Sequence, residues 1–177
     1  MARKYTFFCK ALSKDAFVYK GEFESEPQDG LDLFPLYKIE FNKKSLLLWK
    51  DSLNGTHTIL TGKYEGFTRS TVTISGSGLQ STAKRNSLFS DGWSFVYMAD
   101  KFKWRVPAST GEWCLINAKD QIIAKFNRAT SIAGKIGCLH LGANIDNNLE
   151  ALVVLTCEIV HRTVNSSEQT AATAHGS

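Results

Sequence analysis

The segment DNNLEALVVLTCEIVHRTV, residues 146–164, is the most apolar part of this chain and decides its fold. From residue 149 to residue 160 only two glutamates and one threonine interrupt the apolar side chains, so any fold must hide the segment almost completely. Its β-branched residues suit a strand. However, residues 149–164 would form a strand about 53 Å long but a helix only about 24 Å long. Only the helix matches the size of a small domain.

The flanks of this segment carry the signals of helix ends. Three polar residues precede it, and Asn147 and Glu150 have the spacing of a capping box. His161 and Arg162 are expected in the last turn, where positive side chains face the negative end of the helix dipole. We therefore predict one helix over residues 147–163, apolar nearly all round and covered by other structure on most sides.

The chain before residue 142 consists of short runs with alternating, β-branched or aromatic residues. Short turn-forming segments separate most of them, which favours antiparallel neighbours. We predict twelve strands, at residues 5–9, 16–23, 35–41, 45–50, 57–64, 70–76, 79–85, 93–99, 101–106, 112–118, 121–127 and 136–141.

Twelve strands and one apolar helix restrict the architecture. An eight-stranded barrel is filled by its own side chains, so a twelve-stranded one leaves a central space. A helix about 10 Å across can fill it. We predict a mainly β, single-domain protein over residues 1–164, a closed antiparallel barrel around the helix, followed by a disordered tail at 165–177 that has no large apolar residue. The alternative is a two-sheet sandwich with the helix on an outer face, which would require a more amphipathic helix.

Composition is that of a soluble cytoplasmic protein. The chain is 43% hydrophobic and 21% charged, and no apolar run follows the basic start that could serve as a secretory signal. The helix is too short and too acidic to span a bilayer, which needs about 20 apolar residues. Cys9, Cys114, Cys138 and Cys157 are widely spaced, which indicates reduced thiols and no zinc site.

Motifs of catalysis are not found. The histidines at 57, 140, 161 and 175 lack metal-ligand spacing, and the chain has neither a GxSxG elbow nor a phosphate-binding glycine loop. An aromatic and basic motif for specific nucleic-acid binding is also missing. We therefore expect a protein that is not an enzyme, with no cofactor, no metal and no specific nucleic-acid partner.

The charge is unevenly distributed along the chain. Residues 1–42 carry a net charge of −1, residues 43–135 of +8, and residues 136–177 of −3. From residue 101 to residue 106, cations alternate with large apolar residues, which places three cations on one face of a strand. Such a stripe suits an anionic partner, although a solvated lysine-rich surface has the same pattern. The candidate headgroup-binding residues are Lys84, Arg85, Lys101, Lys103 and Arg105.

Four blocks of sequence resemble the tubby C-terminal-like superfamily, which includes the LURP-one-related proteins and the phospholipid scramblases. They are FKWRV (102–106), EWCLINAKDQIIAKFN (112–127), GKIGCLHL (134–141) and LEALVVLTCEIVHR (149–162). The last three are similar, in kind and order, to small fungal members. The resemblance implies a closed twelve-stranded barrel around a central helix. It also implies phosphoinositide binding, which in the tubby branch uses lysines and arginines on neighbouring strands.

From these features we expect a non-enzymatic intracellular binding module, peripheral at the membrane, whose basic outer face contacts anionic phospholipid headgroups. One alternative is a regulatory barrel whose partner is another protein. A second is a carbohydrate-binding protein, in which exposed rings of Trp93 and Trp113 at strand starts would hold a sugar, with Asp91 and Asn86 nearby. The oligomeric state stays open.

Overall fold

The computed structural model describes residues 2–10, 13–27, 34–51, 55–87, 90–107, 111–129 and 134–174. These ranges contain twelve strands followed by one helix. The elements are β1 (Arg3–Cys9), β2 (Ala16–Lys20), β3 (Tyr37–Asn42), β4 (Ser45–Lys50), β5 (His57–Glu65), β6 (Thr71–Gly76), β7 (Leu79–Ser87), β8 (Ser90–Tyr97), β9 (Asp100–Arg105), β10 (Glu112–Ile116), β11 (Ile122–Arg128), β12 (Lys135–Leu141) and α1 (Asn147–Ala174).

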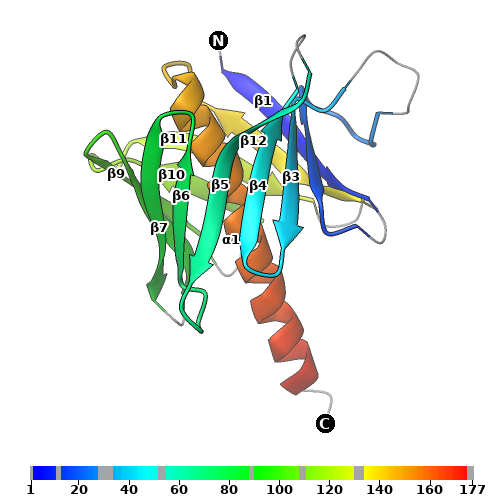
Figure 1. The fold of residues 1–177 in the computed structure, drawn as a ribbon. Coiled ribbons are helices and arrows are strands. Elements are labelled where there is room, and N and C mark those ends of the chain that lie inside the picture. The colour runs from blue at the N-terminus through cyan, green and yellow to red at the C-terminus, as the bar shows by residue number, and fades with distance from the viewer. Residues whose placement is uncertain are drawn as a thin grey trace.

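The strands form a closed barrel in which every strand is antiparallel to its neighbours in the chain (Figure 1). The barrel closes where β1 pairs with β12, in a register that joins Arg3 to Leu141 and Phe7 to Gly137. Closure leaves no open edge with unpaired backbone groups. The predicted barrel is confirmed, and the alternative of a two-sheet sandwich is wrong.

Alternation along each strand decides which side chains enter the barrel. In β9, Phe102 and Trp104 are buried, whereas Lys101, Lys103 and Arg105 between and beside them are exposed. Successive side chains of a strand point to opposite faces, so one face of β9 belongs to the core and the other to solvent. The predicted placement of three cations on one face of this strand is confirmed, and Phe102 and Trp104 face inward.

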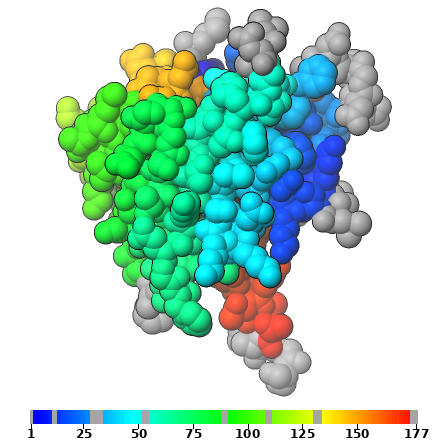
Figure 2. Space-filling model, in the orientation of Figure 1, coloured from blue at the N-terminus to red at the C-terminus, as the bar shows by residue number. Residues whose placement is uncertain are grey.

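Helix α1 fills the interior of the barrel. Every residue from 149 to 160 is buried, as the apolar sequence of this segment requires. The helix starts at one barrel end, crosses the interior and leaves at the other end (Figure 1). In the space-filling view, strands cover its middle on the visible face, and only its start and its last turns reach the surface (Figure 2).

The start of the helix is capped by Asp146 rather than by the predicted capping box. Asp146 Oδ1 accepts hydrogen bonds from the backbone amides of Asn148 and Leu149, both at 2.9 Å. Glu150 does not return to the backbone. Its carboxylate instead turns to the barrel wall, where it pairs with Arg3 and accepts a hydrogen bond of 2.5 Å from the Tyr37 hydroxyl. Burying a carboxylate without partners costs more free energy than a helix start gains from a second cap, so Glu150 pairs with the wall.

The buried hydroxyl group of Thr156, in the middle of the buried part of the helix, is matched by one strand residue. Thr156 Oγ1 accepts a 3.1 Å hydrogen bond from the indole nitrogen of Trp104 in β9, and donates one of 2.8 Å to the carbonyl of Leu152. Both partners are fully buried. This bond fixes the rotation and height of α1 relative to β9, because burying either group without its partner costs free energy.

The other buried carboxylate of the helix is neutralised from within the helix. Glu158 is 1% exposed, and its Oε1 lies 2.7 Å from Nε of Arg162. The Arg162 guanidinium also lies over the ring of Phe41, 4.3 Å from its centroid. His161 and Arg162 are therefore internal residues of α1, and the prediction that they form its last turn is wrong.

The helix is longer than the sequence indicated. It does not end near residue 163 but continues to Ala174. The prediction of a disordered tail over residues 165–177 is wrong as far as Ala174, and residues 175–177 lie outside the described part of the chain.

Contacts with the barrel rim explain why the polar end of the helix persists. Arg128 of β11 forms two ion-pair contacts with Glu168, at 2.6 and 2.7 Å, and donates a 2.8 Å hydrogen bond to Asn165 Oδ1. These side chains are 37 and 40 positions apart in the chain. Local composition therefore gave no sign of the contact.

Most predicted strand ranges agree with the structure to within two residues at each end. The exceptions are β8, which spans Ser90–Tyr97 rather than residues 93–99, and β2. Strand β2 ends at Lys20 rather than at residue 23, because Gly21 has a φ of +125°. The backbone beyond Lys20 bonds to a side chain of β1 instead. Thr6 Oγ1 donates to the carbonyl of Gly21 at 2.9 Å and accepts from the amide of Phe23 at 3.0 Å.

The bond between Trp104 and Thr156 gives a test of how the helix is held. We expect Thr156→Val to lower the free energy of unfolding by about 1–3 kcal/mol, because it leaves the buried indole N–H without an acceptor. Thr170→Val is the matched control, since Thr170 is exposed and donates only to the carbonyl of Ser166. Urea unfolding followed by tryptophan fluorescence measures both. Equal stability of the two variants would contradict this role.

The pair of Arg128 and Glu168 predicts a pH-dependent helix end. The hydrogen bonds from Arg128 lower the pKa of the Glu168 carboxyl in the folded protein. A lowered folded pKa stabilises the fold above the unfolded pKa, about 4.3 for glutamate, and this contribution is lost as the pH falls through the folded pKa. We expect smaller amide-exchange protection factors, measured against the intrinsic rate at each pH, for residues 165–174 below about pH 4.3. Glu168→Gln should remove this step, and an unchanged pH profile in that variant would contradict the assignment.

Candidate functional site

The five candidate cations do not form one surface. Lys84 of β7 and Lys101, Lys103 and Arg105 of β9 lie on the outer face of the barrel and are exposed. Arg85 belongs to the opposite face of β7, because it follows the buried Ala83 by two residues. Its guanidinium is turned towards the barrel end where the helix leaves.

Two of these cations are neutralised by carboxylates. Arg85 Nη2 lies 2.9 Å from Oδ1 of Asp91, with both side chains partly buried. Arg105 Nη2 lies 2.6 Å from Oδ1 of Asp120, in the turn between β10 and β11. For a ligand, these arginines offer less positive charge than their sequence positions indicate.

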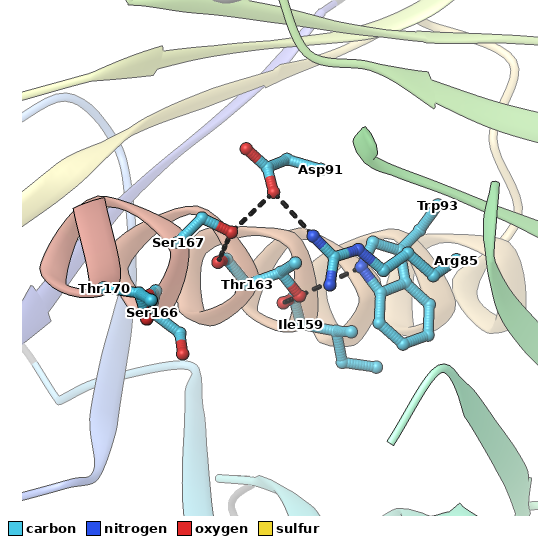
Figure 3. Close-up of polar contacts among 8 residues, drawn as sticks. All are labelled: Arg85, Asp91, Trp93, Ile159, Thr163, Ser166, Ser167 and Thr170. Atoms are coloured by element: carbon cyan, nitrogen blue, oxygen red, sulfur yellow. Dashed lines mark hydrogen bonds and ion pairs between the residues drawn. The ribbon is translucent and has the colours of Figure 1, made fainter. Parts of the chain in front are cut away.

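The contacts of Arg85 are structural, as the close-up shows (Figure 3). Asp91 accepts hydrogen bonds from Arg85 and from the hydroxyl of Ser167 on α1, each at 2.9 Å. One helical turn earlier, Thr163 accepts a 3.0 Å hydrogen bond from the indole of Trp93. These residues join β7 and β8 to the emerging helix.

The three remaining cations are Lys84, Lys101 and Lys103. They lie in two adjacent rows, where a row is the set of residues paired with one another across neighbouring strands, here β7, β8 and β9. The register pairs Lys84 with Ser94, and Ser94 with Lys103. In the neighbouring row, Val96 is paired with Lys101. Neighbouring strands are about 4.8 Å apart, so the Cα atoms of Lys84 and Lys103 are roughly 10 Å apart. Three ammonium groups thus share one small area of the outer surface.

The same rows continue onto β6 and β5 and add one lysine that sequence reasoning missed. Thr73 is paired with Thr82 on one side and with Lys63 on the other. Lys63 is exposed and therefore belongs to the row of Lys101. It is 38 positions from Lys101 in sequence, so only the strand register, which the turns set, could have revealed it.

An open depression lies within these rows, over β7, β8 and β9. Its lining contains two of the predicted cations, two hydroxyl groups and one exposed apolar side chain, together with Phe95, whose own side chain is buried. The lining residues are Thr82, Lys84, Ser94, Phe95, Val96 and Lys101. We call the surface formed by Lys63, Thr82, Lys84, Ser94, Val96, Lys101 and Lys103 the lysine face.

Among the described residues, the positive charge of the lysine face is offset only in part, by Glu65, which follows Lys63 by two residues on the same face of β5. None of the four lysines of this face has an ion-pair partner in the described part of the chain, in contrast to Lys125, which lies 2.9 Å from Glu112 on the neighbouring part of the barrel. The carboxylate closest in the rows, Glu65, accepts a hydrogen bond from Thr73. Two lysines about 7 Å apart on one strand repel each other by about 0.6 kcal/mol in water, so an anion placed between them relieves repulsion.

The tryptophans expected at the rim do not offer a sugar-binding platform. Trp93 and Trp113 are 1% and 2% exposed. Trp93 bonds to Thr163, and Trp113 packs against Phe126 with ring centroids 4.9 Å apart. The exposed rings that the carbohydrate-binding alternative requires are therefore not found at these two positions, because both side chains alternate into the core. The nearby Asp91 is occupied by Arg85.

The thiols show no sign of activation. Burial is the main cause that raises the pKa of Cys9, Cys114 and Cys157 above the usual value of a thiol. Thiolates are the reactive form, so these side chains are poor nucleophiles at neutral pH. Among the described residues no three histidine, cysteine or acidic side chains come close enough together to hold a metal ion. No described helix is both long and apolar enough to cross a membrane.

Comparison of the chain with protein-family models, with curated proteins and with solved structures found no match. The expected relationship to the tubby C-terminal-like superfamily therefore stays a prediction. The residues of the lysine face themselves indicate which ligands suit it.

Adjacent cations of β7 are expected to behave differently when each is replaced. Arg85→Met should lower the free energy of unfolding by about 1.5–3 kcal/mol, because it removes a charge-assisted hydrogen bond to the partly buried Asp91. Lys84→Met should change stability by no more than about 0.5 kcal/mol, since Lys84 is exposed and lies away from such contacts. Thermal unfolding of both variants tests the division. Equal losses would show that Lys84 also has a structural role.

Proposed function

We propose that this protein is a non-enzymatic, peripheral membrane-binding module, and that its lysine face contacts the phosphate groups of anionic phospholipid headgroups. The observation that carries the proposal is the clustering of Lys84, Lys101 and Lys103 around a depression without carboxylate partners among the described residues. Because α1 fills the barrel, the binding surface lies on the outer wall.

The chemistry of the lysine face suits phosphate esters. Ammonium groups are compact, mobile point charges that adapt to phosphates in several orientations. The hydroxyl groups of Thr82 and Ser94 lie between the lysines and can donate hydrogen bonds to phosphate oxygens. Headgroups with several phosphates, such as those of phosphoinositides, offer the most contacts to such a pattern.

The resemblance to the tubby superfamily points in the same direction. Its lipid-binding branch uses basic residues on neighbouring barrel strands, and here the basic residues lie on β7 and β9, with Ser94 of β8 between them. The proposal depends on the charge pattern of the lysine face and takes only the ligand class from the resemblance.

The free energy with which the lysine face is expected to bind an anionic membrane is moderate. Each lysine close to an anionic leaflet contributes about 1 kcal/mol. Four lysines would then contribute about 4 kcal/mol, a binding strength that is reversible and falls with ionic strength. This suits a protein that associates with membranes rather than one that is permanently anchored.

The proposal is tested by reversing charge on the lysine face. Lys101→Glu combined with Lys103→Glu should weaken binding to vesicles containing phosphatidylinositol bisphosphate by roughly 30-fold or more, since two contributions of about 1 kcal/mol are lost and repulsion is added. Vesicle co-sedimentation measures the affinity, with pure phosphatidylcholine vesicles as the reference.

The control is an equal change of charge on the opposite side of the barrel. Lys43→Glu with Lys44→Glu alters the exposed turn between β3 and β4, and β3 and β9 are separated by equally many strands in both directions. This variant should keep most of the vesicle binding. If both double variants lose binding equally, only net charge matters and the proposed site is wrong. If neither loses it, an acidic protein partner becomes the better explanation of the lysine face.

A further inference from the structure

Exposed apolar side chains lie on the lysine face and next to it, towards one end of the barrel. Val96 of β8 is 46% exposed, Met98 in the turn between β8 and β9 is 79% exposed, and Ile122 at the start of β11 is 55% exposed. Ile122 is paired with Ile116, which is in turn paired with Lys103. Apolar groups therefore lie on both sides of the strand that carries Lys101 and Lys103.

The apex of the turn between β8 and β9 is unusual for a hairpin. Met98 and Ala99 have φ values of +47° and +70°. Two-residue hairpin turns with positive φ at both positions favour asparagine and glycine, and other residues are strained there. The stability of the turn thus does not explain a methionine at its apex. Strained positions of this kind are often kept for function.

The base of this hairpin is firmly attached to the rest of the protein. Tyr97 is paired with Asp100 across the turn, and its hydroxyl lies 3.0 Å from both carboxylate oxygens of Asp146, the cap of α1. Two residues further down, the rings of Phe95 and Phe102 stack with centroids 5.3 Å apart. Met98 is therefore presented outward by a rigid support, which lowers the entropic cost of using it in binding.

We propose that Met98 inserts into the acyl-chain boundary of an anionic leaflet, with Val96 and Ile122 following at the interface, while the lysine face contacts the headgroups. This inference rests on the proposed function and adds to it the orientation of the barrel, with the turn between β8 and β9 facing the membrane. An apolar group close to cations is the combination that binds at anionic lipid interfaces.

A leaflet fits this feature better than a folded protein partner. Met98 stands at a projecting turn, and a fluid leaflet accepts a projection without a preformed pocket. Asp100 follows the turn and is exposed. Its carboxylate opposes approach to an anionic surface, so the lysines must outweigh it.

Insertion can be measured by placing a fluorophore at the apex. In Met98→Trp, fluorescence above the wild-type background should be quenched by vesicles with brominated acyl chains. Of the native tryptophans, Trp93, Trp104 and Trp113 are buried in the barrel, and the wild-type protein measured in parallel gives the background. Phe67→Trp is the control, since Phe67 is 102% exposed in the turn between β5 and β6. That turn lies at the other end of the barrel, so its tryptophan should stay unquenched.

Affinity gives the second measurement. Met98→Asn should weaken binding to phosphatidylinositol bisphosphate vesicles by about tenfold through the loss of one buried apolar side chain. Asparagine tolerates positive φ, so folding should be retained, which thermal unfolding checks. Phe67→Ser should leave vesicle binding unchanged. Binding of soluble inositol trisphosphate, which requires only the lysine face, should be equal in wild type and Met98→Asn.

The outcomes separate the two proposals. If vesicle binding depends on Lys101 and Lys103, but the fluorescence of Met98→Trp is not quenched and Met98→Asn binds like wild type, insertion is wrong and the proposed function stands. If Met98→Asn also loses soluble inositol trisphosphate, Met98 acts at the headgroup site and insertion is again wrong. If the wild type does not bind anionic vesicles, both proposals fail.

Discussion

The structure depends on the complete removal of one helix from water. Helix α1 carries apolar residues on nearly all sides, so it can be stable only inside a cavity lined by apolar side chains, and twelve strands supply that cavity. Burial then makes each polar atom on the helix a constraint. Glu150 requires Arg3 and Tyr37, and Thr156 requires Trp104. These contacts set the position of the helix, because an unpaired buried group would cost more than most single contacts gain.

Filling the interior also decides where the protein can act. Barrels with an empty interior bind ligands inside, but here the helix and the inward-facing aromatic residues occupy that space. What remains for recognition is the outer wall and the turns. On β7 to β9 the outer wall is built from alternate residues of strands whose other residues form the core. The same alternation that packs Phe95 and Phe102 inward therefore turns Ser94, Lys101 and Lys103 outward.

The lysine face and the apex at Met98 differ in kind from the paired charges elsewhere. Arg105 with Asp120, and Lys125 with Glu112, are neutral as pairs and suit a solvated surface. Lysines that have no ion-pair partner in the described part of the chain raise the local potential and gain most when an anion binds. The strained turn between β8 and β9 adds an apolar side chain, Met98, next to this region of positive potential. Charge and apolar surface together suit an interface between water and lipid better than either does alone.

The sequence by itself determined the fold class, because the apolar pattern of residues 149–160 and the period of two in the strands are local properties that few architectures satisfy. It also placed Lys101, Lys103 and Arg105 together on one face of a strand. Only the tertiary structure decided which cations are free to act. The pairing of Arg85 with Asp91, the alignment of Lys63 with Lys101, and the clamp of Arg128 on Glu168 join distant residues through strand register and helix position. Such contacts follow from long-range packing, which no local pattern encodes.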